Sequence, residues 1–204
     1  EPASRAGAAA LLGQFVEMGE LGEMSDGNLK QVTDCLLTAA ADSDNHLART
    51  ALESLGYSSR NEVAALIESA FRHRDPRWQA SALVAAGRSA DARWQGQVIE
   101  SFLSEEPQVR LAAVRAAGEL QLKSARQPLL NLIEEEEDDE VLQAIIWSLS
   151  LIGGEDVREY LQTLIDDTDD EAMLQFLEGA LLNLEFTEDS ANFSLLAYDE
   201  DEPV

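Results

Sequence analysis

Apolar residues recur along the chain with the spacing of one helix face, and the whole pattern returns at a nearly fixed interval. Val109, Val141 and Met173 occupy the same position in three successive copies of the pattern. A fixed period of this kind is the signature of a repeat architecture. Three aligned segments, the last of which contains Val109, each end on a glycine: "HLARTALESLG" (46–56), "RWQASALVAAG" (77–87) and "QVRLAAVRAAG" (108–118).

The second half of each repeat carries an apolar face of its own. In one repeat Val63, Ile67 and Phe71 lie at i, i+4 and i+8, on one side of an α-helix. Each repeat is therefore predicted to fold as two antiparallel helices, helix A and then helix B, joined by a short turn. The expected repeats cover residues 3–43, 44–74, 75–105, 106–137, 138–168 and 169–198.

The two ends of the chain follow the pattern less regularly. We expect a first helix A over residues 4–20 and a first helix B over 28–41. At the other end, "ANFSLLAY" (191–198) is predicted as a short last helix B that closes the core. The sequence thus predicts one repeat domain over residues 1–198 and an acidic disordered tail over 199–204.

The junctions between repeats carry helix-start and helix-stop signals. An acid there satisfies free backbone amides and meets the positive end of the helix dipole. Gly56 and Gly87 lie near the ends of their A helices, where we expect glycine to relieve backbone strain. The seven-acid run 134–140 falls on such a junction and lacks the spaced ligands and turn glycine of a calcium loop. The acids that open successive A helices are Asp44, Asp75, Glu106, Asp138 and Asp170.

These two-helix units resemble HEAT-like repeats, in the short form found in phycobilisome lyases and many bacterial scaffold proteins. The resemblance rests on the short repeat period and on Asp-Pro or Glu-Pro before segments such as "QVRLAAVRAAGEL", and it covers about residues 44–184. It implies an all-α fold, a right-handed α-α superhelix or HEAT-like solenoid of about five to six two-helix repeats. The A helices would form the convex face and the B helices the concave face. It also implies that the protein binds another macromolecule.

Charge and composition exclude several classes of function. A formal net charge of −26 argues against nucleic acid and against anionic membranes as partners. No apolar run reaches the length of a membrane span, and no signal-peptide pattern opens the sequence. We therefore expect a cytoplasmic protein whose partner is another protein, contacted through a basic or amphipathic helix.

The sequence offers no convincing catalytic, cofactor or metal site. Cys35, the single cysteine, falls on a boundary position of a B helix and is expected to be half-buried. His46 and His73 lack a partner at metal-ligand spacing. The glycine pair at 153–154 lacks the Lys-Ser/Thr of a phosphate-binding loop. We therefore predict no enzyme, no cofactor and no metal.

The helical register selects a candidate binding face. The B-helix positions opposite the core combine small and apolar residues, as expected of a groove for an amphipathic helix. Coverage of these residues by a neighbouring segment is the alternative. Trp147 falls on a variable position of a helix A, where it is either exposed as an interface candidate or buried against a neighbouring unit. The predicted face comprises Ala65, Arg72, Gly96, Ile99, Leu103, Gln127 and Leu130.

The basic residues that interrupt the acidic sequence leave two interpretations open. They either contact an anion or acidic peptide or pair with neighbouring acids. They are Arg72, Arg74, Arg77, Arg88 and Arg93, with His73 among them.

The function predicted first is a non-enzymatic protein–protein interaction scaffold. The alternative that the resemblance suggests is a bilin-lyase-like subunit or chromophore-protein chaperone. That alternative requires a deep groove with a functional Cys or His. A DNA-binding HEAT protein is disfavoured by the charge.

Overall fold

The computed structural model describes the backbone of residues 2–198 and the side chains of residues 4–190. This part of the chain is helical and contains no strand, so the predicted all-α repeat fold is confirmed. The α-helices are α1 (Pro2–Glu20), α2 (Asp26–Ala40), α3 (Asn45–Leu55), α4 (Asn61–Phe71), α5 (Pro76–Arg88), α6 (Gln95–Glu100), α7 (Pro107–Glu119), α8 (Arg126–Leu132), α9 (Asp139–Ile152), α10 (Glu155–Asp167) and α11 (Glu171–Tyr198). Short 3₁₀ helices are η1 (Ala92–Trp94), η2 (Ser101–Leu103) and η3 (Lys123–Ala125).

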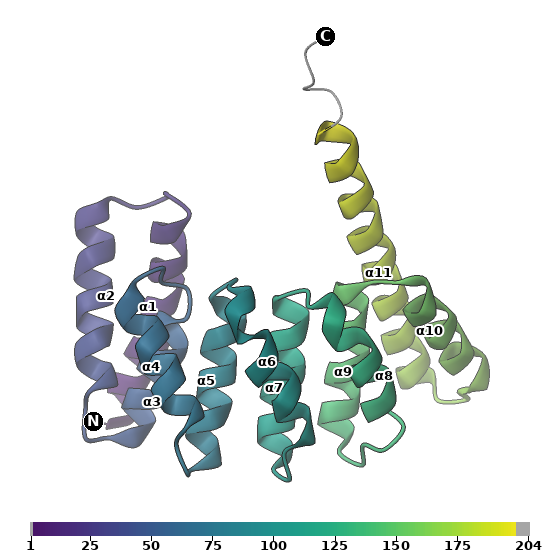
Figure 1. Cartoon of the computed structure of the whole chain (residues 1–204), viewed down its shortest axis with the longest axis horizontal. Helices are drawn as coiled ribbons and strands as arrows, with labels where there is room; N and C mark the ends of the chain where they lie inside the picture. The colour runs from purple at the N-terminus through teal and green to yellow at the C-terminus, as the bar shows by residue number, and fades with distance from the viewer. Residues whose placement is uncertain (1, 199–204) are drawn as a thin grey trace. The chain divides into compact units, whose positions relative to one another are not determined.

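The helices form two compact units, Glu1–Leu120 and Gln121–Val204. In the first unit the A helices α1, α3, α5 and α7 pack in chain order, and α2 and α4 pack against A helices as predicted (Figure 1). In the second unit α9 packs against α8, α10 and α11. One repeat domain over residues 1–198 and the hand of the superhelix stay predictions.

The predicted acidic caps are present at most junctions. The Asp44 carboxylate accepts hydrogen bonds from the backbone N–H groups of His46 and Leu47. The Asp138 carboxylate accepts them from the N–H groups of Glu140 and Val141. Asp75 accepts from the Arg77 N–H at 3.0 Å and Asp170 from the Met173 N–H at 2.8 Å. Glu106 makes no such bond, so the cap prediction is wrong at that position. Its side chain is one methylene longer than that of Asp, the residue preferred at a helix N-cap.

The cap of α5 predicts a pH-dependent contribution to stability. Hydrogen bonds from the Arg77 side chain and then from its backbone N–H lower the pKa of Asp75 from 3.8 to about 2. Because the folded pKa lies below the unfolded one, the stabilisation is complete above pH 4 and is lost as the pH falls through 2. Asp75→Asn keeps a capping side chain and removes this titration. Urea unfolding should show the variant losing less stability over this pH range than the wild type, whereas parallel pH curves would contradict the prediction.

The regular spacing of the glycines has a different cause from the one predicted. Gly56 has right-handed helical dihedrals, φ −50° and ψ −33°, so it relieves no backbone strain. A Cβ built on it would lie 2.7 Å from both Cα and O of Ala85 on the next A helix. A Cβ on Gly87 would likewise lie 3.0 Å from Cα of Ala116. These glycines therefore allow neighbouring A helices to approach closely.

A second class of small residues meets those glycines from the other side. Ser54 and Ala85 lie two residues before Gly56 and Gly87. Ala116 holds the same position in α7. Each faces a glycine of the preceding A helix: Ser54 meets Gly13, Ala85 meets Gly56 and Ala116 meets Gly87. In the first unit one position thus faces the preceding A helix, and the glycine two residues later faces the next.

The last helix is longer than predicted. Residues 191–198 do not form a separate helix B, because α11 continues unbroken from Glu171 to Tyr198. The polar residues Thr187 and Glu188, just before this segment, form hydrogen bonds within α11 or to neighbouring elements. Thr187 Oγ1 donates to the Asn183 carbonyl at 2.9 Å, and Glu188 bonds residues near α10. The predicted tail over 199–204 lies outside the described residues.

Candidate protein-interaction surface

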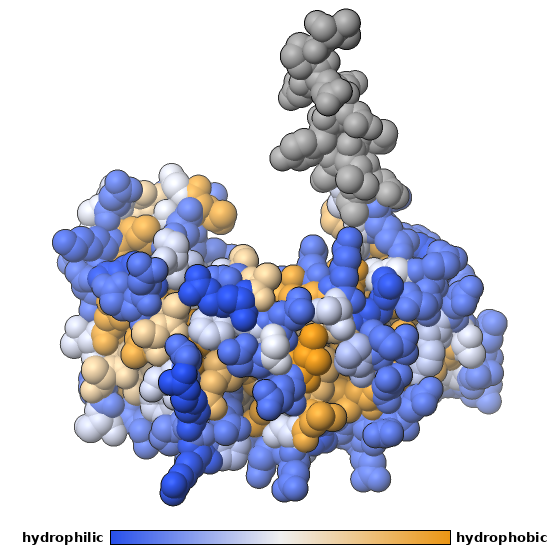
Figure 2. All heavy atoms as spheres, viewed as in Figure 1, coloured by the Kyte–Doolittle hydropathy of each residue, from blue (hydrophilic) through white to orange (hydrophobic). Residues whose placement is uncertain are grey.

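Four of the predicted binding residues lie on the B-helix side of the first unit. Ala65 on α4 and Gly96 on α6 are exposed, and Ile99 on α6 is half-buried. Leu103 in η2 is 85% exposed. Figure 2, seen from the side on which α4 and α6 lie, shows hydrophobic patches among hydrophilic side chains. The predicted mixture of small and apolar residues is therefore open to solvent in this unit.

Leu103 is exposed because its neighbours in sequence form the buried face. Trp94, Val98 and Phe102 lie at i, i+4 and i+8 and are all buried. Their spacing continues through the chain segment that runs from η1 through α6 to η2. Leu103 follows Phe102 by one residue, which turns it away from that face.

A hollow of about 470 Å³ lies beside Leu103. Phe71 of α4, Gln79 of α5 and Val109 of α7 line it. The other lining residues are Gln97, Glu100, Ser101, Leu103 and Ser104. The centroid of the Phe71 ring lies 5.8 Å from that of the buried Trp94. Sequence reasoning missed this hollow, because Gln79 and Val109 belong to A helices of different repeats.

The basic residues of the first unit are largely engaged with neighbouring groups. Arg77 pairs with Asp75 at 2.8 Å and Arg93 with Asp91 at 2.5 Å. Arg72, a predicted site residue, is exposed and pairs with Glu68 one helical turn earlier. These pairs agree with the second interpretation, in which the basic residues compensate neighbouring acids. Contact with an acidic ligand stays a prediction.

Arg88 is held by two groups of the α3 end. Its Nη1 donates to the Glu53 carbonyl at 2.8 Å, and its guanidinium carbon lies 5.2 Å from the centre of the Tyr57 ring. Trp78 on α5 is half-buried. Its ring centroid lies 5.5 Å from that of His73, which gives both rings a partner near the surface.

The remaining predicted binding residues lie in the second unit. Gln127 is exposed on α8 and its Nε2 donates to Asn131 Oδ1 at 3.0 Å. Leu130, one turn along the same helix, is half-buried. Trp147 on α9 is 44% exposed, which decides between the two alternatives left open for it.

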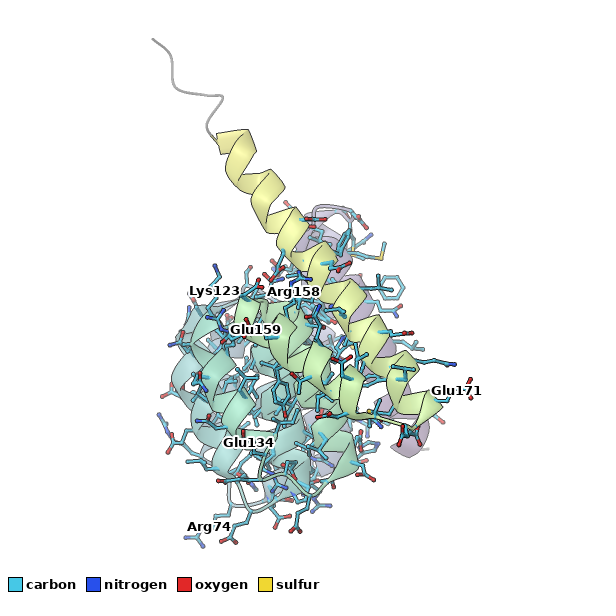
Figure 3. All side chains as sticks on the ribbon, turned by 90° about the vertical axis from the view of Figure 1, so that its right-hand side faces the viewer. Arg74, Lys123, Glu134, Arg158, Glu159 and Glu171 are labelled. Carbon is cyan, nitrogen blue, oxygen red and sulfur yellow. The ribbon has the colours of Figure 1, made fainter. Side chains whose placement is uncertain are left out.

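The outward side of α10 is acidic. Glu155, Asp156, Glu159 and the pair Asp166 and Asp167 are all exposed. Figure 3 shows Glu159 on this helix and Glu134 near the junction that precedes α9. Burial, with the nearby Glu134 charge, raises the pKa of Tyr160 on the same helix. The acidic run 134–140 itself lies between α8 and the first residues of α9, which confirms that it is a junction.

The turn between α9 and α10 connects three elements of the second unit. Arg126 Nη1 donates to the Gly153 carbonyl at 3.1 Å, and the Gly154 N–H donates to Glu188 Oε1 at 3.2 Å. Arg158 on α10 pairs with the same Glu188 of α11. Figure 3 shows Arg158 close to α11. These contacts explain why the polar residues near position 188 stay helical.

The structure places the potential nucleophile and ligand side chains apart. Cys35 is exposed on α2, not half-buried as expected. It lines a hollow of about 390 Å³ with residues of α1 and α3, and no histidine is among those lining residues. Across the described residues, no group of three His, Cys, Asp or Glu side chains is placed to hold a metal ion.

None of the described helices is both long enough and apolar enough to cross a membrane.

The paired helices, the repeated small-residue contacts between A helices and the acidic junctions define an all-α helical repeat protein. Residues 96–180 match the family model for HEAT repeats. The chain accordingly carries HEAT-like repeats over residues 96–180. No curated protein matches it.

Proposed function

We propose that the chain is a non-enzymatic scaffold that binds a helix of another protein on the B-helix side of its first unit. HEAT repeats commonly serve as protein-interaction scaffolds, and residues 96–180 carry them. We further propose that the scaffold acts in the cytoplasm, where its single exposed cysteine would stay reduced. Gln127, Leu130 and Trp147 of the second unit are proposed as further partner contacts.

The observation that carries the proposal is Leu103, 85% exposed at the edge of a hollow of about 470 Å³. Complete burial of a leucine against a partner contributes roughly 1.5–3 kcal/mol. The half-buried Ile99 lies one helical turn earlier and extends the apolar contact. An apolar anchor beside a hollow suits the apolar stripe of an amphipathic helix.

The polar lining of the hollow indicates the chemistry of the partner helix. Gln79, Gln97 and Ser101 offer hydrogen-bonding groups around the apolar anchor. Glu100 adds a negative charge in a chain whose net charge is −26. A partner helix with basic residues beside its apolar stripe therefore fits better than an acidic one.

Leu103→Asp is expected to weaken partner binding at least about tenfold, because it places a charge where an apolar anchor would be buried. The partner is first isolated with the wild-type chain, and affinities are then measured by isothermal titration calorimetry. Leu182→Asp is the matched control, since Leu182 is 67% exposed on α11 of the other unit. Both variants should keep the wild-type circular dichroism spectrum. Equal affinities of the Leu103→Asp variant and the wild type would overturn the proposal.

The bilin-lyase-like alternative is not favoured by any contact in the described residues. It requires a functional Cys or His inside a groove. Cys35 lies on α2, away from Leu103 in sequence and on a different hollow, and that hollow has no histidine lining.

A further inference from the structure

The first helix exposes a face that the other A helices of its unit bury. Gly13 of α1 meets Ser54 of α3, as Gly56 meets Ala85 and Gly87 meets Ala116. Gly13 therefore occupies the position that faces the next helix. Leu11, two residues earlier, occupies the position that faces a preceding helix in α3, α5 and α7. It is 64% exposed.

The exposed face of α1 carries no charge. It lies opposite the buried residues of the helix, which include Ala6, Ala9 and Val16. An uncharged face that exposes Leu11, Phe15 and Met18 together indicates a contact. Its exposed members are Ser4, Gly7, Ala8, Leu11, Gln14, Phe15 and Met18.

Two charged residues of α1, Arg5 and Glu20, bond to other parts of the unit. Glu17 is exposed on the flank between this face and the buried side of the helix. Arg5 pairs with Asp42 beyond the end of α2. Glu20 Oε1 accepts from the Ser59 N–H at 2.9 Å. Two such chains, each with a net charge of −26, can approach most closely on a face without charges.

The two halves of this face are complementary in size. Ser4, Gly7 and Ala8 are small, whereas Phe15 and Met18 are large. A Cβ built on Gly7 would meet nothing within 4 Å, so no contact inside the chain requires glycine there. Glycine within a helix is less favourable than alanine, and it allows another backbone to approach closely.

We infer that the outer face of α1 binds a second copy of this chain, whose α1 packs antiparallel with Leu11 at the two-fold axis. In this register Phe15 is opposite Gly7 of the other copy, since each lies four residues from Leu11. Phe15 enters the hole between Ser4, Gly7, Ala8 and Leu11, as in knobs-into-holes packing. The same contact forms twice, as a two-fold interface requires.

The size and charge of the interface determine its expected strength. A helix of 19 residues is about 28 Å long, so two such helices bury an area at the low end of specific interfaces. The dimer should therefore form in the micromolar range. Salt should strengthen it, because screening reduces the repulsion between two chains of charge −26. A basic helix of another protein on this face would instead bind more weakly as salt increases.

Disulfide trapping tests the register. Leu11→Cys in a Cys35→Ser background is expected to give a covalent dimer on mild oxidation, because the two sulfurs meet at the axis. Leu182→Cys in the same background, also on an exposed helix face, should stay monomeric. A cross-link only in a mixture of the Leu11→Cys and Leu182→Cys chains would show head-to-tail packing and overturn the inference.

Sedimentation equilibrium tests the affinity without a cross-link. Phe15→Glu should weaken the dimer at least about tenfold, because it places two buried charges in the interface. Phe186→Glu, on α11 where Phe186 is 73% exposed, should leave it unchanged. Circular dichroism checks that both variants fold. A wild-type chain that stays monomeric up to about millimolar concentration, or a dimer that persists in Phe15→Glu, would overturn the inference.

Discussion

Gly56→Ala is expected to destabilise the first unit by about 2 kcal/mol or more. The new Cβ would lie 2.7 Å from Cα and O of Ala85, and this neighbour is backbone that cannot rotate away. The gain in helix propensity of roughly 1 kcal/mol offsets only part of the cost. Urea unfolding followed by far-UV circular dichroism measures the change in free energy of unfolding.

Gly179→Ala on α11 is the matched control for this substitution. A Cβ at Gly179 would meet nothing within 4 Å, and the residue lies within a continuous helix. The control is therefore expected to gain roughly 0.5–1 kcal/mol of stability from the loss of backbone freedom in the unfolded chain. A Gly56→Ala variant as stable as the wild type would contradict the close approach of α3 and α5.

Gly154→Ala is expected to destabilise the second unit by about 3 kcal/mol. Gly154 has φ +130° and ψ 150°, a region that residues with a Cβ rarely occupy. A Cβ there would also lie 2.7 Å from Asp156 Oδ1 and 2.8 Å from Cζ of Arg126. Displacement of Arg126 would break its bond to the Gly153 carbonyl. Amide hydrogen exchange should show faster opening of α9, α10 and α11 than of the first unit.

Gly153→Ala separates backbone strain from the steric clash. Gly153 has φ +79°, but its Cβ would approach other atoms no closer than 3.8 Å. This variant should lose roughly 1–2 kcal/mol, from strain alone. Equal losses for the two substitutions would show that Arg126 moves aside without cost and would remove the clash from the explanation.

The pattern of apolar residues was sufficient to predict most helices and their pairing. The predicted helix over 28–41 corresponds to α2, and the A helices begin at the acids chosen from sequence. Such features are local, because a helix face and an N-cap depend on residues within a few positions of one another. The local pattern was not sufficient for Trp147: its position varies between repeats, which left exposure and burial both open, and the structure leaves it 44% exposed.

Predictions that depended on long-range contacts were less successful. The length of α11 was missed, since Glu188 bonds to Gly154 and Arg158, which lie far from it in the chain. The hollow beside Leu103 was missed as well, because its lining comes from α4, α5, α6 and α7. Neither feature has a signal in the spacing of nearby residues.

The sequence by itself determined the all-α repeat class, the positions of the junctions and the residues that face the core, because a helical period and its caps are written in local order. Only the tertiary structure decided why glycine recurs at the same position of successive A helices. The spacing alone suggested relief of strain, whereas the contacts of Gly56 with Ala85 and of Gly87 with Ala116 show close helix packing. It also decided that the uncharged face of α1 is left open, since exposure depends on which helices are neighbours in space and not on their order in the chain.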